Sequence, residues 1–241
     1  PGRVSDDEPD RSAAARGLID SPARHCLARL KLLHCGPMVK LNRPKGSIGK
    51  HLIEKHLSLD WLQTLGRILH EKDQSCGLYT NDRTYPTYHA IAAVLKPRSI
   101  LEVGVRFGYS LASLAAGAGP GAQIFGVDQE TYEKGSNAQA TASLKLLGIE
   151  AQLFLSDSKT FDIPARTGRT RFDLIHIDGD HTAEGALHDL LRYMQFTDRL
   201  LVDDVLDSRV WAAIKAFTSL QEKPISVTYF DTATGLILIE L

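Results

Sequence analysis

The feature that most constrains the fold is a regular alternation of short apolar runs with helical stretches, which begins at residue 99. Five runs have the composition of strands: SILEV, QIFGV, AQLFL, LIHI and RLLV. The stretches at 110–118, 137–147 and 183–193 lie between them and have helical composition. Strands and helices that alternate in this way form a parallel sheet with right-handed crossovers. The sequence therefore predicts a doubly wound, Rossmann-like α/β fold.

The last part of the chain predicts a different strand pairing. After a helical stretch at 210–220, the runs ISVTYF and GLILIEL are joined by the turn-rich segment DTATG. This pattern is typical of an antiparallel hairpin. We therefore expect a mostly parallel, seven-stranded sheet with a C-terminal antiparallel hairpin, in a domain that spans residues 76–241.

Residues 1–75 have another texture and predict an N-terminal tail and helical extension. The first 20 residues are polar and lack apolar periodicity, which is typical of a mobile tail. Two later segments carry apolar residues at helical spacing, at Leu27, Leu30 and Leu33, and at Ile53, Leu57, Trp61, Leu65 and Ile68. The basic segment VKLNRPKGSIGKH separates them and predicts a loop. We expect this extension to act as a lid or as a dimer contact.

Charge and cysteine usage limit the partners of the protein. The chain has 28 basic and 29 acidic side chains, so no global field favours nucleic acid or an anionic membrane. No window approaches the roughly 18 apolar residues that span a bilayer, and the polar start lacks the apolar core of a signal peptide. The cysteines Cys26, Cys35 and Cys76 are odd in number and lack CxxC spacing, which indicates reduced thiols. We expect a cytoplasmic homodimer or higher homo-oligomer that acts on a small molecule, without nucleic acid or membrane partners.

A glycine-containing loop follows the first predicted strand. The segment runs Glu102-Val-Gly104-Val-Arg-Phe-Gly108-Tyr109-Ser110 and leads into a helix of small residues. Glycines at such a position let a ligand approach the backbone amides at the start of a helix. Glycines at a strand-to-helix turn are also common for packing alone.

Two further carboxylates follow the next strands at the same edge of the predicted sheet. Asp128 ends the second strand about 20 residues after the glycine loop, where a carboxylate can accept from both ribose hydroxyls of a nucleoside. Asp157 and Ser158 follow the third strand in LFLSDS and could contact an adenine ring. A helix cap is the alternative role of Asp157.

These segments together resemble the class I S-adenosylmethionine-dependent methyltransferases. ILEVGVRFGYS looks like their first motif, FGVD like their second and SDS like their adenine-side motif, over residues 98–241. The resemblance implies that Glu102, Gly104, Gly108, Tyr109, Ser110, Asp128, Asp157, Ser158 and Asp178 bind S-adenosyl-L-methionine. The third glycine of the usual motif is missing, as in the metal-dependent branch, and the terminal hairpin also disfavours a dinucleotide dehydrogenase.

An acidic cluster follows the fourth and fifth predicted strands. FDLIHIDGDH places Asp178, Asp180 and His181 after the fourth strand, and LLVDDV places Asp203 and Asp204 after the fifth. Neighbouring strands lie about 4.8 Å apart, so these carboxylates can share one cation, and oxygen ligands suit Mg²⁺ or Mn²⁺. Because successive strand residues point to opposite faces, Asp203 and Asp204 can both be ligands only if the backbone turns there.

IDGDH and VDDV resemble the metal-dependent O-methyltransferases, particularly the natural-product sugar branch of macrocin, mycinamicin and noviose O-methyltransferases. By motif position, the resemblance implies that Asp178, Asp203 and Asp204 hold the metal and that His181 is the general base. Asp180 could orient His181. A histidine with a pKa near neutrality can take a hydroxyl proton while a cation stabilises the alkoxide. His176 and His188 are predicted to be structural.

The sequence-based hypothesis is methylation of a hydroxyl of a sugar or glycosylated natural product. The low aromatic content of 7% favours a sugar acceptor over a planar catechol. Catechol-type phenolic methylation, a cephalosporin hydroxylase-like reaction and a non-catalytic cofactor-binding role remain open. Tyr79, Thr80 and the basic loop at 43–50 could border the cleft, although loop residues of this kind are usually ordinary surface.

Overall fold

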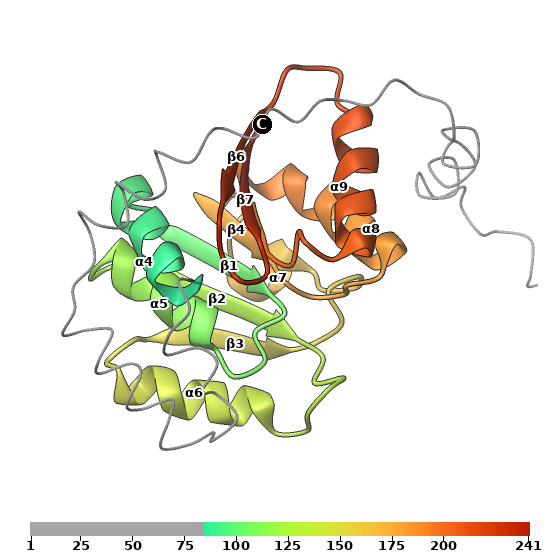
Figure 1. Ribbon diagram of the computed structural model, residues 1–241. Helices are drawn as coiled ribbons and strands as arrows, with labels where there is room; N and C mark the ends of the chain where they lie inside the picture. Colours follow the sequence, from blue (N-terminus) through green and yellow to red (C-terminus); the bar gives the residue numbers. More distant parts are fainter. Residues whose placement is uncertain (1–83) are drawn as a thin grey trace, which may run out of the picture. The chain divides into compact units, whose positions relative to one another are not determined.

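The computed structural model describes residues 84–241, which form the part of the chain coloured in Figure 1. The predicted tail, the two predicted N-terminal helices and the basic loop between them lie outside the described residues. Tyr79 and Thr80 also lie outside them, so their predicted place beside the cleft stays a prediction.

Seven strands form one sheet in the order β3-β2-β1-β4-β5-β7-β6. Their bounds are β1 Ser99–Val103, β2 Gln123–Asp128, β3 Ala151–Leu155, β4 Leu174–Ile177, β5 Arg199–Val202, β6 Ser226–Phe230 and β7 Leu236–Glu240. The first five strands pair in parallel, whereas β7 is antiparallel to both β5 and β6. The predicted Rossmann-like sheet with a C-terminal antiparallel hairpin is confirmed.

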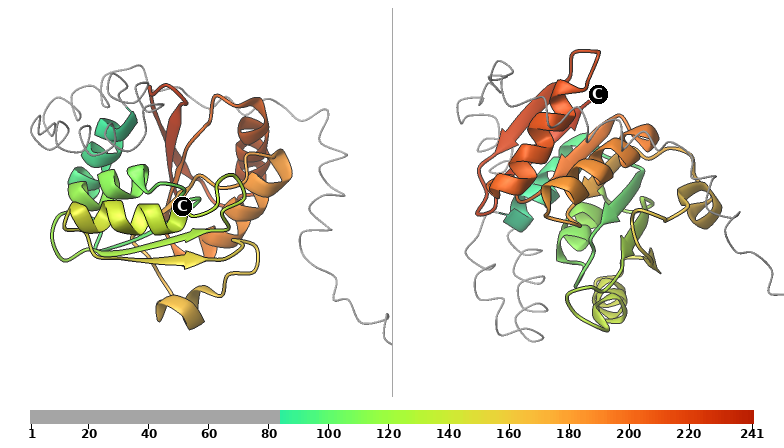
Figure 2. Two further views of the ribbon diagram at one scale, coloured as in Figure 1. Left: turned by 90° about the horizontal axis from the view of Figure 1, so that it is seen from below. Right: turned by 90° about the vertical axis from the view of Figure 1, so that its right-hand side faces the viewer.

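Helices cover both faces of this sheet (Figures 1 and 2). The α-helices are α4 Thr84–Leu95, α5 Tyr109–Ala118, α6 Ser136–Leu146, α7 Ile163–Thr167, α8 Ala183–Tyr193 and α9 Ser208–Ser219, with a 3₁₀ turn, η4, at Met194–Phe196. α4 packs along α5 on one face, and α8 packs along α9 on the other. Among the described residues, no helix combines the length and apolar character needed to cross a membrane.

The central strands are buried on both faces because helices cover both sides. Every residue of β1 and of β4 is buried, which explains why these strands are nearly continuous apolar runs rather than alternating ones. Two ionisable residues interrupt this pattern: Glu102 on β1 and His176 on β4 lie side by side in the sheet and are both fully buried.

The position of β1 defines where a ligand can bind. β1 lies between β2 and β4, so the order of strands along the chain reverses on either side of it. In open α/β sheets, ligands bind in the crevice outside the carboxyl ends of the strands at such a switch point. The glycine loop, Asp128, the SDS segment and the acidic cluster all follow strands at this edge. The fold thus brings the predicted site residues to one rim of the domain.

Candidate active site

The loop after β1 lies against the loop after β4, and Gly104 permits this approach. A Cβ atom at Gly104 would lie 2.0 Å from the carbonyl oxygen of Asp178, and its φ is +90°. Gly108, with φ +78°, is the N-cap residue of α5. Both glycines therefore have a packing or conformational reason to be there. The residues at the start of α5 are buried beneath this loop.

Asp128 ties the glycine loop to the end of β2. Its Oδ2 atom accepts a hydrogen bond of 2.8 Å from the Arg106 amide. Its Oδ1 atom accepts one of 2.6 Å from the Glu130 amide. Because each carboxylate oxygen has two lone pairs, Asp128 can hold the loop and still accept from ribose hydroxyls.

The adenine-side segment after β3 forms a tight turn. Asp157 accepts from the Lys159 amide at 2.9 Å, so its carboxylate stabilises this turn rather than capping a regular helix. The Ser158 hydroxyl donates to Asp189 on α8 at 3.0 Å. The Ser158 side chain therefore points toward α8, and its backbone carbonyl also accepts from the Tyr193 hydroxyl of that helix at 3.1 Å.

Glu102, Tyr109 and Ser110 are buried beneath the glycine loop. The Ser110 hydroxyl donates to Oε1 of Glu102 at 2.5 Å. Nδ1 of His176 lies 2.7 Å from the same oxygen. The other oxygen, Oε2, has no hydrogen-bond partner in residues 84–241. Among these side chains, Glu102 thus keeps an acceptor for a ligand.

His176 links this buried pair to the acidic cluster. Its ring meets the ring of Tyr88 edge-on, with centroids 4.9 Å apart. The Tyr88 hydroxyl makes no hydrogen bond of regular geometry within the described part, but it faces the carboxylate of Asp203. Burial and, next, the negative charge of Asp203 raise the pKa of Tyr88. The phenol therefore stays protonated beneath the site.

The acidic cluster is centred on His181. Nε2 of His181 lies 3.2 Å from Oδ1 of Asp178, and Nδ1 lies 3.1 Å from Oδ2 of Asp204. The ligand atoms of these three residues lie within 4.8 Å of one another. One carboxylate thus comes from the end of β4 and the other from the end of β5.

The backbone turns at Asp204. Such a turn is needed if Asp203 and Asp204 are both to be metal ligands, because successive strand residues point to opposite faces. Asp204 has φ +54°, and its carbonyl accepts from the Asp207 amide at 2.8 Å in a turn. The Asp203 side chain takes another direction and accepts from the Thr234 hydroxyl at 2.7 Å. Thr234 lies in the loop between β6 and β7, so the terminal hairpin supports the cluster.

Asp180 does not orient His181, contrary to one sequence-based suggestion. Its Oδ1 atom accepts from the Thr182 amide at 2.9 Å, and its Oδ2 atom pairs with Nζ of Lys159 at 3.3 Å. The amide contact arises because Thr182 is the N-cap of α8 directly after the loop. Asp178 and Asp204 orient the imidazole instead.

The electrostatics of the cluster favour a cation. The hydrogen bond to Asp178 raises the pKa of His181 to about 9. Burial raises the pKa of Asp178 to about 7, and it also raises that of Asp204. His181 therefore carries positive charge between two carboxylates when no other cation neutralises them. The carboxylates of Asp178 and Asp204 fit a divalent ion, whose charge would replace that proton.

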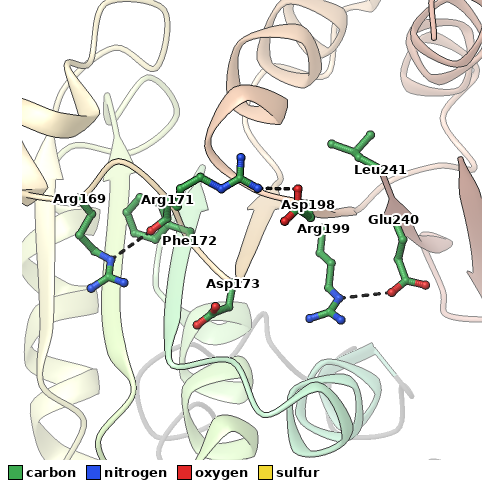
Figure 3. A pocket seen from close by; sticks show the side chains of 8 residues that line it. All are labelled: Arg169, Arg171, Phe172, Asp173, Asp198, Arg199, Glu240 and Leu241. Atoms are coloured by element: carbon green, nitrogen blue, oxygen red, sulfur yellow. Dashed lines mark hydrogen bonds and ion pairs between the residues drawn. The ribbon is translucent and has the colours of Figure 1, made fainter. Parts of the chain in front are cut away.

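A hollow at the opposite edge of the sheet has no histidine between carboxylates among the residues that line it (Figure 3). It has a volume of about 400 Å³ and lies beside the starts of β4 and β5. Two of its arginines pair with carboxylates, Arg171 with Asp198 and Arg199 with Glu240. Such exposed ion pairs contribute little to the free energy of folding. The cluster of Asp178, His181 and Asp204 at the carboxyl edge is therefore the better candidate for catalytic chemistry.

The structure adds three residues that the sequence analysis did not select. Tyr88 and Thr234 contribute through contacts between distant segments, for which the sequence carries no signal. Asp189 did leave a signal, because it occupies the apolar face of α8 with Ala186, Leu190 and Tyr193, all of them buried.

Comparisons with known proteins agree with this arrangement. Residues 101–205 match the model of a methyltransferase domain family, Methyltransf_24. No curated protein matches the sequence.

Three solved structures illustrate the shared fold. An O-methyltransferase from Bacillus cereus in complex with S-adenosylhomocysteine has a TM-score of 0.58 and 18% identity, covering 78% of this chain and 99% of that chain. The O-methyltransferase TomG from Streptomyces achromogenes, in complex with S-adenosylmethionine, has a TM-score of 0.55 and 17% identity, covering 81% and 99%. The S-adenosylhomocysteine-bound methyltransferase PaMTH1 from Podospora anserina has a TM-score of 0.53 and 17% identity, covering 98% and 99%.

The similarity in structure concerns the fold, whereas the family match concerns the segment that carries the glycine loop, Asp128 and the acidic cluster. Both comparisons point to methyltransferases, and the observed strand order is the one expected from the sequence resemblance. The chain therefore has the fold of these methyltransferases, and its residues 101–205 are similar to a methyltransferase domain family.

Proposed function

We propose that the enzyme transfers the methyl group of S-adenosylmethionine to a hydroxyl oxygen, with His181 as the general base and with a divalent cation at the acidic cluster. The observation that carries this proposal is the place of His181, whose ring lies between the carboxylates of Asp178 and Asp204 at the edge where the glycine loop ends. Two structurally similar proteins are O-methyltransferases by name.

The cofactor is proposed to lie along the loops after β1, β2 and β3. The glycine loop borders the cofactor, Asp128 accepts from the ribose, and residues 157–158 border the adenine. Glu102 offers its unpaired Oε2 atom from below. The loop that carries Asp178 lies against Gly104, so it would lie beside a cofactor bound at the glycine loop.

The cation is proposed to be Mg²⁺ or Mn²⁺, held by Asp178 and Asp204 with Asp203 beside them. When bound, it supplies positive charge that stabilises a forming alkoxide and opposes protonation of His181. Asp178 and Asp204 orient the His181 ring toward the rim. With a cation neutralising the two carboxylates, one ring nitrogen of neutral His181 would keep its hydrogen bond to a carboxylate and the other would be left to accept the hydroxyl proton. The cofactor loops would serve to position the methyl donor beside the hydroxyl oxygen.

The acceptor is proposed to be a sugar or glycoside with two neighbouring hydroxyls. The rim of the cluster is polar. Asp180 on the same loop pairs with Lys159, and Asp207 interacts electrostatically with His181. Paired hydroxyls complement such groups better than a flat apolar ring does. A phenolic catechol also offers two adjacent oxygens, so it forms the second arm of the test.

The test is a panel of acceptors incubated with S-adenosylmethionine, with S-adenosylhomocysteine release as the readout. Glycosides with vicinal hydroxyls, matched glycosides with one hydroxyl blocked, and catechols are compared with Mg²⁺ and with a chelator. Cation-dependent turnover of the vicinal glycosides supports the proposal. Turnover of catechols alone would show that the acceptor is a phenol. Turnover that persists in chelator would show that the reaction does not need a cation.

A further inference from the structure

A fully buried carboxylate lies on α8 behind the candidate site. Asp189 is 0% exposed. It shares the inner face of α8 with Ala186, Leu190 and Tyr193, which are apolar or aromatic and buried. A carboxylate on such a face costs free energy unless it is hydrogen-bonded. We therefore expect Asp189 to have a role that an apolar side chain at this position could not perform.

One oxygen of Asp189 holds the adenine-side segment. Oδ1 accepts from the Ser158 hydroxyl at 3.0 Å. One turn further along α8, the Tyr193 hydroxyl donates to the backbone carbonyl of Ser158 at 3.1 Å. Nδ1 of His188 lies 3.5 Å from the same Oδ1 atom. The segment after β3 is thus fastened to α8 through both the side chain and the backbone of Ser158.

The other oxygen of Asp189 faces the loop after β4. Oδ2 has no hydrogen-bond partner in residues 84–241. It lies 3.3 Å from the position that a Cβ atom of Gly179 would take. Gly179 separates Asp178 from Asp180 and lies two residues before His181. The carboxylate therefore stands between the adenine-side segment and the loop that carries the proposed base.

We propose that Asp189 is a positioning residue that holds Ser158, and with it the adenine-side segment, at a set distance from the loop at 178–181. This proposal rests on the assignment of residues 157–158 to the adenine side of the cofactor site. Asp189 acts through Ser158 and Gly179 and does not touch the cofactor. The two hydrogen bonds to Ser158 fix the position of the adenine-side segment relative to α8 and to the loop at 178–181.

The test is calorimetric titration of the full chain with S-adenosylhomocysteine, using Asp189→Ala, Ser158→Ala and the double variant. Each single substitution removes the same hydrogen bond, so we expect Kd to rise about tenfold in each and no further in the double variant. Asp189→Asn keeps an acceptor for the Ser158 hydroxyl and should retain most of the affinity.

Asp173→Ala is the matched control for a merely structural effect. Oδ2 of Asp173 accepts from the Arg98 amide, the Ser99 amide and the Ser99 hydroxyl, so it also clamps the chain. It lies at the opposite edge of the sheet, in the hollow of Figure 3. Thermal unfolding is measured for every variant. We expect Asp173→Ala to lower Tm without changing Kd.

Equal changes of Kd in Asp189→Ala and Asp173→Ala, or single effects that add in the double variant, would overturn the proposal. Should Asp189→Ala not fold, Ser158→Ala decides the question, since an unchanged Kd in that variant excludes the positioning role. Wild-type protein that does not bind S-adenosylhomocysteine would overturn the cofactor site and this proposal together. Wild-type binding with unchanged Kd in the variants would overturn the positioning role alone.

Discussion

The Nδ1 atom of His181 lies 3.1 Å from Oδ2 of Asp204, although the two residues follow different strands. The contact depends on the left-handed backbone at Asp204, which turns the chain out of β5. It joins the proposed base to the proposed cation ligands, so proton transfer and cation binding are expected to depend on the same few side chains.

Substitution of His181 should separate catalysis from cofactor binding. We expect His181→Gln to lower kcat by roughly a hundredfold or more, because positioned bases typically contribute that much. The Kd for S-adenosylhomocysteine should stay close to that of the wild type. His89→Gln on α4 is the control, with activity expected to be unchanged. Equal kcat in the two variants would exclude His181 as the base.

Removal of the cation or of its ligands should abolish turnover while the protein stays folded. We expect Asp204→Asn to weaken Mn²⁺ binding by at least about tenfold, because one charged ligand is lost. Calorimetric titration with Mn²⁺ measures this directly, beside activity in chelator. Asp198→Asn, at the other edge of the sheet, should bind Mn²⁺ like the wild type. Unchanged Mn²⁺ affinity in Asp204→Asn would contradict the proposed ligand set.

Gly104 should be far less tolerant of a side chain than a glycine of similar conformation in open space. Gly104→Ala meets the carbonyl of Asp178 and also has φ +90°, whereas Gly119, with φ +86°, has no atom within 4 Å of its Cβ position. We expect Gly119→Ala to cost about 1 kcal/mol of unfolding free energy from backbone conformation alone. Gly104→Ala should cost clearly more and weaken S-adenosylhomocysteine binding. Urea unfolding and calorimetry measure the two effects, and equal losses would show that the close approach is unimportant.

The buried pair of His176 and Glu102 should give stability that depends on pH. Burial alone would lower the pKa of His176, but the hydrogen bond and the charge of Glu102 outweigh it, and the pKa is raised. A raised folded-state pKa gives stability that is fully present below the unfolded value of about 6.5 and lost as pH rises through the folded value. The difference in unfolding free energy between wild type and His176→Gln should therefore be larger at pH 6 than at pH 9. A difference that grows with pH would mean that His176 is buried as the neutral ring.

The sequence predicts the sheet well because its signals are local. The runs that became β1, β3, β4 and β5 match the observed strands residue for residue. For β1, β4 and β5 the reason is that buried parallel strands are continuous apolar runs with sharp polar ends, whereas β3 lies at the edge of the sheet and is partly exposed. The five-residue helix α7 was not predicted. It depends on the Asp162 side chain, which caps the Ala165 amide at 3.1 Å, and is too short to show periodicity.

The sequence indicates which residues lie together at the strand ends, but it does not indicate which way their side chains point. The strand ends place Asp178, His181 and Asp204 together, as the sequence indicates. The Asp203 side chain pairs with Thr234, and the Ser158 side chain pairs with Asp189. In each case the partner lies 31 residues away in the sequence, and no local pattern encodes such a contact. Asp189 was recognisable only as a charge on an apolar helix face.

The most direct test of the account is calorimetric titration with S-adenosylhomocysteine of the wild-type protein and of Asp128→Ala, with and without Mg²⁺. Asp128 orders the glycine loop through the Arg106 amide and is the proposed ribose acceptor. We predict micromolar binding by the wild type and a loss of at least about tenfold in Asp128→Ala, consistent with the removal of one charged acceptor. Absence of binding by the wild-type protein in every condition, or identical binding by the variant, would contradict the account.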